Sequence, residues 1–338
     1  YGNNEEVNVG LAKIATIIQN ERQNSPNVLL IDNGDLIQGT PLTYHFVKKM
    51  PNEKNPMISI LNYLNYDAAI IGNHEFNYGM EILNQAVKES QFPWLSANIV
   101  DKKQGNPYFG KPYIIKKIQD AKIAILGITT HYIPNWEDPN HIKDLQFNDA
   151  FEETKKWVEW IHKEEKPDIL IVSYHGGFEC DVKTGEPTET LTGENQAYLM
   201  CKEINGIDVL LTGHQHRTIS EKIGDCVVVQ PGFNGQHLGK VTLSLVKESN
   251  KWTIAEAEST LIPTESVEAD DAIIDISKAY EEAVQQWLDQ PIGKINGDML
   301  VSDPIKIRTL DNPLIEFINK VQMYYSHASI SNTALFNN

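Results

Sequence analysis

Four short aliphatic runs in this chain each end on a polar segment whose side chains are common metal ligands. The four junctions are Val28–Ile31 before Asn33-Gly34-Asp35, Ala68–Ile71 before Gly72-Asn73-His74-Glu75, Ile169–Val172 before His175-Gly176-Gly177, and Val209–Leu211 before Gly213-His214-Gln215-His216. Continuous aliphatic runs are typical of buried parallel strands, and open α/β sheets bind their ligands beyond the carboxyl ends of such strands. The pattern therefore predicts a sheet that brings Asp, Asn and His side chains to one edge.

The other hydrophobic patterns alternate between helical and strand spacing as far as about residue 240, which favours helices packed around mainly parallel sheet. An amphipathic helix is expected near the start, where Val7, Leu11, Ile14 and Ile18 recur at helical spacing. The stretch from Leu238 to Ile254 predicts a hairpin that closes the domain.

A change in composition at Pro263-Thr264-Glu265-Ser266 predicts the end of this domain. We expect one domain over residues 1–262, a linker helix within residues 263–292, and the beginning of a further domain over residues 293–338. The linker has apolar residues at helical spacing and acidic residues in its first turn, which suits the helix dipole. The last segment has too little core to stand alone, so we expect a piece of a longer protein.

Composition limits the possible partners of the chain. Its 338 residues carry a net charge of −17, which argues against a protein that grips long nucleic acids. An anionic small substrate remains possible, because bound divalent cations can reverse the local field. The sequence contains no run of the roughly 20 apolar residues that would span a bilayer. Three cysteines are too few for a disulfide framework or a zinc ribbon.

Gly72-Asn73-His74-Glu75 is the most specific of the four motifs, because Asn is an unusual metal ligand. On an extended backbone its neighbour points the other way, so Asn73 could bind metal while His74 faces the substrate. The glycines after His175 allow the backbone to approach the metals closely. On an extended segment His214 and His216 would lie on one side and reach different ions. A lone histidine is more often structural, but four motifs in this order favour ligands.

The series of motifs resembles the signature of the calcineurin-like metallophosphoesterases, over essentially everything to residue 260. The segment Gly34–Gly39, the linker helix and the unfinished tail are similar to the bacterial 5′-nucleotidase group, whose C-terminal domain binds the nucleoside base. Within this group, Gly72–Gly79 is similar to the 2′,3′-cyclic-nucleotide 2′-phosphodiesterase/3′-nucleotidase branch, because the 5′-nucleotidase branch usually has Asp in place of Asn77. The chain looks closest to the cell-wall-associated, multi-domain enzyme of bacilli.

The resemblance implies a four-layer α/β/β/α sandwich and two divalent metal ions. Asp35 would bridge the ions; Asn73, His175 and His214 would complete one site, and His216 would serve the other. The donor mix suits Mn²⁺, Fe²⁺ or Zn²⁺ better than Mg²⁺ or Ca²⁺. Of these we expect Mn²⁺ first, with Fe²⁺ or Zn²⁺ possible. His74 would stabilise the transition state or protonate the leaving oxygen.

The implied function is hydrolysis of 2′,3′-cyclic nucleotides to 3′-nucleotides and then to nucleoside and phosphate. Asn77 would orient His74, whereas a carboxylate in its place would hold that ring as an imidazolium. We hypothesise that this difference sets the preference between cyclic and 5′ substrates. The alternatives are a 5′-nucleotidase or nucleotide-sugar hydrolase, and a non-catalytic relative that binds nucleotide or metal.

The resemblance implies partners and a location as well. We expect a small nucleotide substrate, no nucleic-acid polymer, no membrane insertion, further domains of the same chain, and a secreted or cell-wall-associated protein. One departure from the family is serious, because its first motif, Asp-x-His on an N-terminal strand, is missing. We expect that motif upstream of Tyr1; the alternative is a degenerate, non-catalytic relative. Without it, one ion lacks two ligands and the sheet lacks a central strand.

Overall fold

The computed structural model describes residues 7–249, 251–297, 299–300, 303, 305–306 and 310–327. The chain divides into two compact units, Tyr1–Gln285 and Gln286–Asn338. The expected three-part division, with boundaries after residues 262 and 292, stays a prediction. Residues 328–338, which it places in a C-terminal domain, lie outside the described residues.

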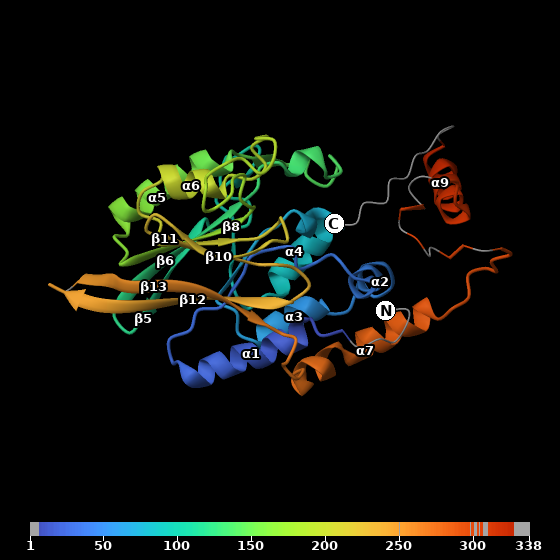
Figure 1. The fold of residues 1–338 in the computed structure, drawn as a ribbon, viewed down its shortest axis with the longest axis horizontal. Coiled ribbons are helices and arrows are strands. Elements are labelled where there is room, and N and C mark those ends of the chain that lie inside the picture. Colours follow the sequence, from blue (N-terminus) through green and yellow to red (C-terminus); the bar gives the residue numbers. More distant parts are fainter. Residues whose placement is uncertain are drawn as a thin grey trace. The chain divides into compact units, whose positions relative to one another are not determined.

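Two sheets form the centre of the first unit (Figure 1). The larger has the strand order β10-β11-β9-β8-β6-β5, and the smaller has the order β1-β2-β3. Their strands are β1 (Ile31–Asp32), β2 (Ala68–Ile70), β3 (Trp94–Leu95), β5 (Tyr113–Ile118), β6 (Ala121–Thr129), β8 (Ile169–His175), β9 (Val209–Thr212), β10 (Thr218–Ile223) and β11 (Cys226–Pro231). The three strands of the smaller sheet are parallel, as are β6, β8, β9 and β11; the edge strands β5 and β10 pair antiparallel. The prediction of mainly parallel sheet is confirmed.

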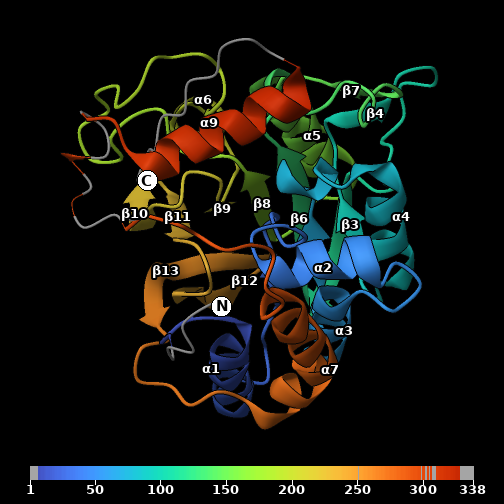
Figure 2. The same cartoon turned by 90° about the vertical axis from the view of Figure 1, so that its right-hand side faces the viewer.

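Helices cover the outer face of each sheet, as Figure 1 and Figure 2 show. Buried residues of α5 and α6 pack on the larger sheet, and those of α3 and α4 pack on the smaller one. A third apolar cluster, which includes Ile70, Ile125 and Ile171, fills the space between the sheets. The helices that lie wholly in this unit are α1 (Leu11–Asn24), α2 (Pro41–Lys49), α3 (Pro56–Tyr63), η1 (His74–Phe76), α4 (Gly79–Glu89), η2 (Ile133–Asn135), α5 (Ala150–Glu164) and α6 (Ala197–Glu203); α7 (Asp271–Leu288) begins in it and ends in the second unit. The expected four-layer α/β/β/α sandwich is confirmed.

Several local predictions can be compared with the structure. The opening helix begins at Leu11, and Val7 is exposed ahead of it. The closing hairpin pairs β12 (His237–Glu248) with β13 (Lys251–Pro263), and two further strands, β4 (Ile99–Asp101) and β7 (Leu145–Phe147), pair with each other. In the second unit, α9 (Pro313–Ser326) begins after Asn312, whose side chain accepts a hydrogen bond from the Leu314 N–H.

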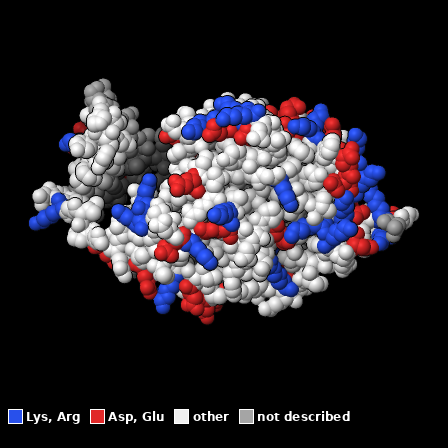
Figure 3. Space-filling model, turned by 180° about the vertical axis from the view of Figure 1, so that it is seen from behind, with Lys and Arg blue, Asp and Glu red and all other residues white. Residues whose placement is uncertain are grey.

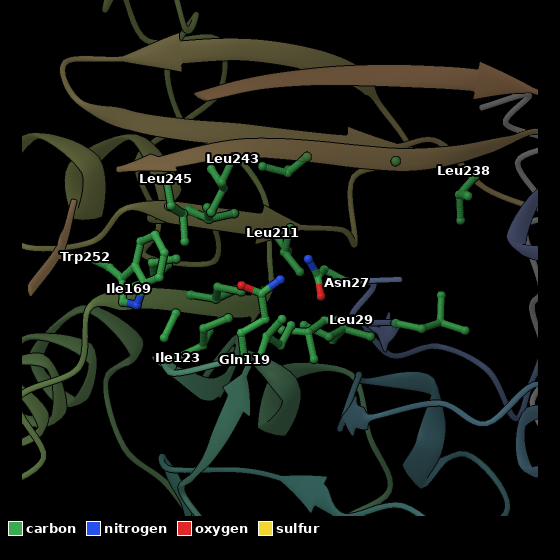
Figure 4. A pocket seen from close by; sticks show the side chains of 18 residues that line it. Asn27, Leu29, Gln119, Ile123, Ile169, Leu211, Leu238, Leu243, Leu245 and Trp252 are labelled. Carbon is green, nitrogen blue, oxygen red and sulfur yellow. The ribbon is translucent and has the colours of Figure 1, made fainter. Parts of the chain in front are cut away.

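A cavity of about 450 Å³, lined by aliphatic side chains and also by Asn27 and Gln119, lies beside β1 (Figure 4). Its aliphatic lining comes from β1, from β12 and from the inner face of the larger sheet, and includes Leu29, Ile31, Ile123, Ile169, Ile171, Val209, Leu211, Val241 and Leu243. β1 pairs with β2 on one side and with no other described strand.

Among the described residues, no helix is both long and apolar enough to cross a bilayer. On the face that Figure 3 shows, acidic side chains lie beside most of the basic ones. The charges there are interspersed rather than gathered in one basic tract.

Candidate metal centre

The carboxyl ends of four strands bring four predicted ligands together. Asp35 follows β1, Asn73 follows β2, His175 is the last residue of β8, and His214 follows β9. One ligand atom from each of Asp35, His175 and His214 lies within 4.8 Å of the other two. Asn73 Oδ1 is 3.0 Å from His175 Nε2 and 2.9 Å from His214 Nδ1, and Asp35 Oδ2 is 3.2 Å from His175 Nε2. We call these four residues the donor cluster.

The second nitrogen of each imidazole in the cluster has a partner that faces away from the other donors. His175 Nδ1 lies 2.6 Å from the backbone oxygen of Asn33, and His214 Nε2 lies 2.9 Å from Glu194 Oε1. In protein metal sites, a ligating histidine almost always donates its other ring N–H to a carbonyl or carboxylate. The geometry therefore leaves Nε2 of His175 and Nδ1 of His214 for a cation. Two imidazoles, a carboxylate and an amide oxygen fit a first-row divalent cation.

The loops that carry the cluster are backbone-strained and closely packed. Asp35 and His214 have φ of 64° and 68°, in the left-handed region that few non-glycine residues adopt. Such outliers gather at functional sites, where the surrounding structure holds them. A Cβ on Gly34 would lie 2.7 Å from the backbone nitrogen of Gly72, so these two loops approach as only glycine permits.

Glu75 is a fully buried carboxylate beneath the cluster. Its oxygens accept hydrogen bonds from the backbone N–H groups of Asp35 at 2.8 Å, Leu36 at 2.6 Å and Gly72 at 2.7 Å. Burial raises the pKa of Glu75, with the nearby charge of Asp35 acting in the same direction. Glu75 thus joins the loop after β1 to the loop after β2. It stands within the most specific of the four motifs, but no role for it was predicted from the sequence.

Asp35 and His175 form an ion pair within the cluster. Burial opposes the charge on Asp35, but the facing His175 holds the pKa of that carboxyl well below its usual range. Burial also opposes the charge on His175, but Asp35 raises the pKa of His175 to about 9. A cation that binds here takes the place of the imidazole proton, so binding is coupled to proton release.

His74 lies next to the cluster, at the start of η1. Its backbone N–H donates to Asp35 Oδ1 at 2.8 Å, and its ring Nδ1 is 2.6 Å from Asn77 Oδ1. The expectation of an extended backbone at this motif is wrong, because Asn73 is helical and η1 begins directly after it. A helical turn, and not the alternation of side chains along a strand, therefore separates the side chains of Asn73 and His74. Asn77 lies one turn on and reaches back to the ring.

His216 lies outside the donor cluster. The expectation that it shares one side of an extended segment with His214 is wrong, because both residues have left-handed φ, 68° and 59°. The exposed ring of His216 instead stacks on Phe233, with centroids 4.9 Å apart and planes 22° apart. Desolvation lowers the pKa of His216, which favours the neutral, ligating form.

The loop after β6 borders the cluster from another side. The half-exposed Trp136 ring lies over His214, with centroids 5.3 Å apart. Two nearby carboxylates, Glu137 in this loop and Glu194 ahead of α6, were not predicted from the sequence. Neither follows a strand nor stands in a motif, so their places depend on tertiary structure.

Comparisons with known proteins agree with this geometry. Residues 7–218 match the family described as calcineurin-like phosphoesterase. A 2′,3′-cyclic-nucleotide 2′-phosphodiesterase/3′-nucleotidase of Salmonella typhimurium is 31% identical over 94% of this chain and 52% of that protein. A trifunctional nucleotide phosphoesterase of Bacillus subtilis, YfkN, is 28% identical over 98% of this chain and 24% of that protein.

Among solved structures, a candidate 5′-nucleotidase from Staphylococcus aureus, in complex with alpha-ketoglutarate, superposes with a TM-score of 0.86. It is 31% identical, and the match covers 96% of this chain and 62% of that one. The chain therefore spans about half the length, or less, of the two curated relatives described above. With the family matched over most of the sandwich and its donor residues assembled at one edge, the chain belongs to the calcineurin-like phosphoesterases.

Proposed function

We propose that this chain carries the active site of an enzyme that hydrolyses 2′,3′-cyclic nucleotides to 3′-nucleotides and then to nucleoside and phosphate. The observation that carries the proposal is the donor cluster with His74 beside it. Each of the two reactions breaks one phosphorus–oxygen bond and consumes one water. The relative from Salmonella typhimurium is named for both reactions, which supports assigning the same pair here.

Calcineurin-like phosphoesterases bind divalent metals, and we propose two in this chain, with Mn²⁺ first and Fe²⁺ or Zn²⁺ as alternatives. Asp35, Asn73, His175 and His214 would hold one cation, and Asp35 and His216 would contribute to the other. Bound cations supply Lewis acidity towards the phosphoryl oxygens and towards the attacking water.

The residues around the cluster would then divide the work. His74, starting with a proton on both ring nitrogens, would give the one on Nε2 to the departing O2′ as the bond from phosphorus to O2′ breaks and its electron pair moves to oxygen. Asn77 would hold the ring in place by accepting the Nδ1–H. Partial proton transfer of this kind contributes about 10²–10⁴-fold to many enzymes.

The cavity beside β1 supports the expected further strand. It lies beside β1, which pairs with β2 alone among the described strands, and much of its wall is aliphatic, as a buried strand requires. We propose that a strand bearing Asp-x-His pairs with β1 there and supplies the remaining ligands of the second cation.

The cellular setting is also a proposal. A nucleotide is the expected substrate, further domains of a longer chain would bind its base, and the protein would be secreted or attached to the cell wall. The matched relatives, which are longer than this chain, support the further domains.

A 5′-nucleotidase is the second candidate, favoured by the staphylococcal structure. Asn77 bears on the choice, because its amide contacts the ring that would serve the leaving oxygen. If the hypothesis on substrate preference is right, Asn77→Asp shifts the ratio of kcat/KM for 2′,3′-cAMP and 5′-AMP towards 5′-AMP. An unchanged ratio contradicts it.

The function is tested by phosphate release from 2′,3′-cAMP, 3′-AMP and 5′-AMP with Mn²⁺, using the full natural chain. A coupled phosphomonoesterase reports the first product of the cyclic substrate. We expect turnover of the first two substrates, lost in His74→Ala and kept in His162→Ala, whose ring bonds to the Gly206 carbonyl on the outer helical layer. Preference for 5′-AMP would move the protein to the second candidate. No turnover of any substrate would favour a binding role.

A further inference from the structure

A line of hydrogen bonds runs outward from the ring of His74. Its Nδ1 lies 2.6 Å from Asn77 Oδ1, and the Asn77 amide nitrogen donates to Glu137 Oε2 at 2.7 Å. The other oxygen of Glu137 lies 2.8 Å from Nδ1 of His141. The line therefore joins η1 to the loop after β6, two segments that are far apart in the sequence.

Glu137 sits where its side chain has little freedom. The residue is buried at 9% exposure, and its Oε1 also accepts the backbone N–H of Asp138 at 2.9 Å. The ring of His141 packs on the start of α4, 3.4 Å from where a Cβ on Gly79 would stand. Both oxygens of Glu137 are thus engaged, one by its own loop and one by Asn77.

An ionised carboxylate can only accept hydrogen bonds, and this fixes the orientation of its neighbour. Asn77 has an oxygen and a nitrogen of almost equal size, so its amide could turn over with little change in shape. Facing Glu137, it must present its NH₂ group. Its oxygen is then left for His74, and the nitrogen of His74 that faces this oxygen must carry a proton.

We propose that Glu137 is a positioning residue for His74, acting through the amide of Asn77. It sets the tautomer of the neutral ring as Nδ1–H and directs Nε2 towards the reacting phosphoester. This inference rests on the proposed function, in which the doubly protonated ring gives its Nε2 proton to the leaving oxygen and the neutral Nδ1–H ring remains. The ring that remains after that transfer keeps its other proton on Nδ1, facing Asn77, so the orientation is unchanged through the reaction.

The variant Glu137→Gln tests the inference with almost no change in shape. The Asp138 N–H needs an oxygen at the Oε1 position, so the new amide turns its NH₂ group towards Asn77. Asn77 must then turn over and present its own NH₂ group to His74. The neutral ring responds by accepting at Nδ1 and carrying its proton on Nε2.

A second variant should reverse that effect. In Asn77→Asp with Glu137→Gln, the carboxylate and the amide exchange places. The amide introduced at position 137 donates to one oxygen of the carboxylate introduced at position 77, and the other oxygen accepts from Nδ1–H of His74. Asn77→Asp alone places two carboxylates against each other with no donor between them. The inference therefore predicts two damaging single changes and a double change that restores the tautomer.

The first readout is ¹⁵N NMR of histidine-labelled protein at alkaline pH, where imidazole is neutral. The resonances of His74 are identified by their loss in His74→Gln. We expect Nδ1–H in the wild type, Nε2–H in Glu137→Gln, and Nδ1–H again in the double variant. Asp138→Asn is the matched control, because it removes a charge from the same loop without touching Asn77, and it should leave the tautomer unchanged.

The second readout is steady-state kinetics with 2′,3′-cAMP on the full natural chain. Glu137→Gln should lower kcat by about 10–100-fold, within the range that proton transfer contributes, and leave KM within about threefold. The double variant should recover part of the loss, because its restored tautomer raises turnover while the carboxylate at position 77 shifts preference towards 5′-AMP. A wild-type tautomer in Glu137→Gln, or a double variant as poor as the single one in both readouts, would overturn the inference. An inactive wild type would instead reject the proposed function, and the NMR result would still decide whether Glu137 positions the ring.

Discussion

The two sides of the metal centre differ in how their side chains are held. In the donor cluster, His175 is tied to the Asn33 carbonyl, His214 to Glu194, and the loop of Asp35 to Glu75. On the other side, His216 is exposed and contacts the ring of Phe233, which is itself 41% exposed.

This difference shows which side chains of the site the described residues hold in place. Catalytic constellations are precise when a second set of side chains locks the first. The donor cluster has that support from packed strands, from the buried Glu75 and from the partly exposed Glu194. Among the described residues, the ring contact of His216 is the one with Phe233, so the geometry of that side depends on the strand proposed beside β1 and on the cation itself.

Substituting one histidine on each side of the site should change cation binding very differently. His175→Ala should abolish tight cation binding and lower kcat by at least about 10³-fold, because it removes a donor and leaves Asp35 without its partner. His216→Ala should lose the second cation and retain one. Metal analysis after gel filtration, with titration calorimetry, gives both stoichiometries. Equal loss of cation in the two variants would contradict the comparison.

The support of the cluster can be tested one bond further out. Glu194→Gln keeps the size of the side chain but weakens its acceptance of the His214 N–H. Changes of this kind typically cost about 10–100-fold in metal affinity. Calorimetry with Mn²⁺ should show that loss for the first cation. Glu186→Gln, an exposed change in the same segment, serves as the control and should bind as the wild type does. An unaltered affinity in Glu194→Gln would mean that Glu194 does not orient its histidine.

Much of the fold could be predicted from the sequence because strand burial leaves a simple pattern. Ile169–Val172 is apolar throughout, and every residue of β8 is buried, as a central parallel strand requires. The meeting of Asp35, His175 and His214 at one place was predictable for the same reason, since strand ends meet at one edge of a sheet. These inferences required only the positions at which the buried strands end.

The other features of the site leave no periodic pattern of residues in the sequence. The backbone at His214 and His216 is left-handed, so strand alternation did not apply to their side chains. The places of Glu137 and Glu194 are set by loops that fold back from outside the strands. A carboxylate in a loop has the same sequence signature whether it is exposed or positions a ligand, and only its partners distinguish the two.

The carboxyl group of Asp32, three residues before Asp35, should make the stability of the fold depend on pH. Burial raises the pKa of Asp32, at the end of β1, to about 7, from an ordinary value of 3.8. The folded state therefore holds a proton that the unfolded state releases, and stability falls as pH rises from about 4 to about 7. Asp32→Asn removes this dependence and should stabilise the cation-free protein above pH 7 by about 2 kcal/mol, below the full linkage value because the side chain is partly exposed. Urea unfolding near pH 4 and above pH 7 measures the effect of Asp32→Asn on the free energy of unfolding. An equal effect at both pH values would contradict a raised pKa of Asp32.

A substitution beside the exposed His216 should change the affinity for a cation only slightly. Phe233→Leu removes the ring stacked on His216, and such contacts are worth about 0.5–1.5 kcal/mol, or roughly twofold to tenfold in affinity. The second cation should bind more weakly by that factor while the first is unchanged, because no described contact joins Phe233 to the donor cluster. Phe233→Tyr keeps the ring and should behave as the wild type in the same titration. Were Phe233→Leu to weaken the first cation as well, the two sides would be coupled, and the independence of the donor cluster would be lost.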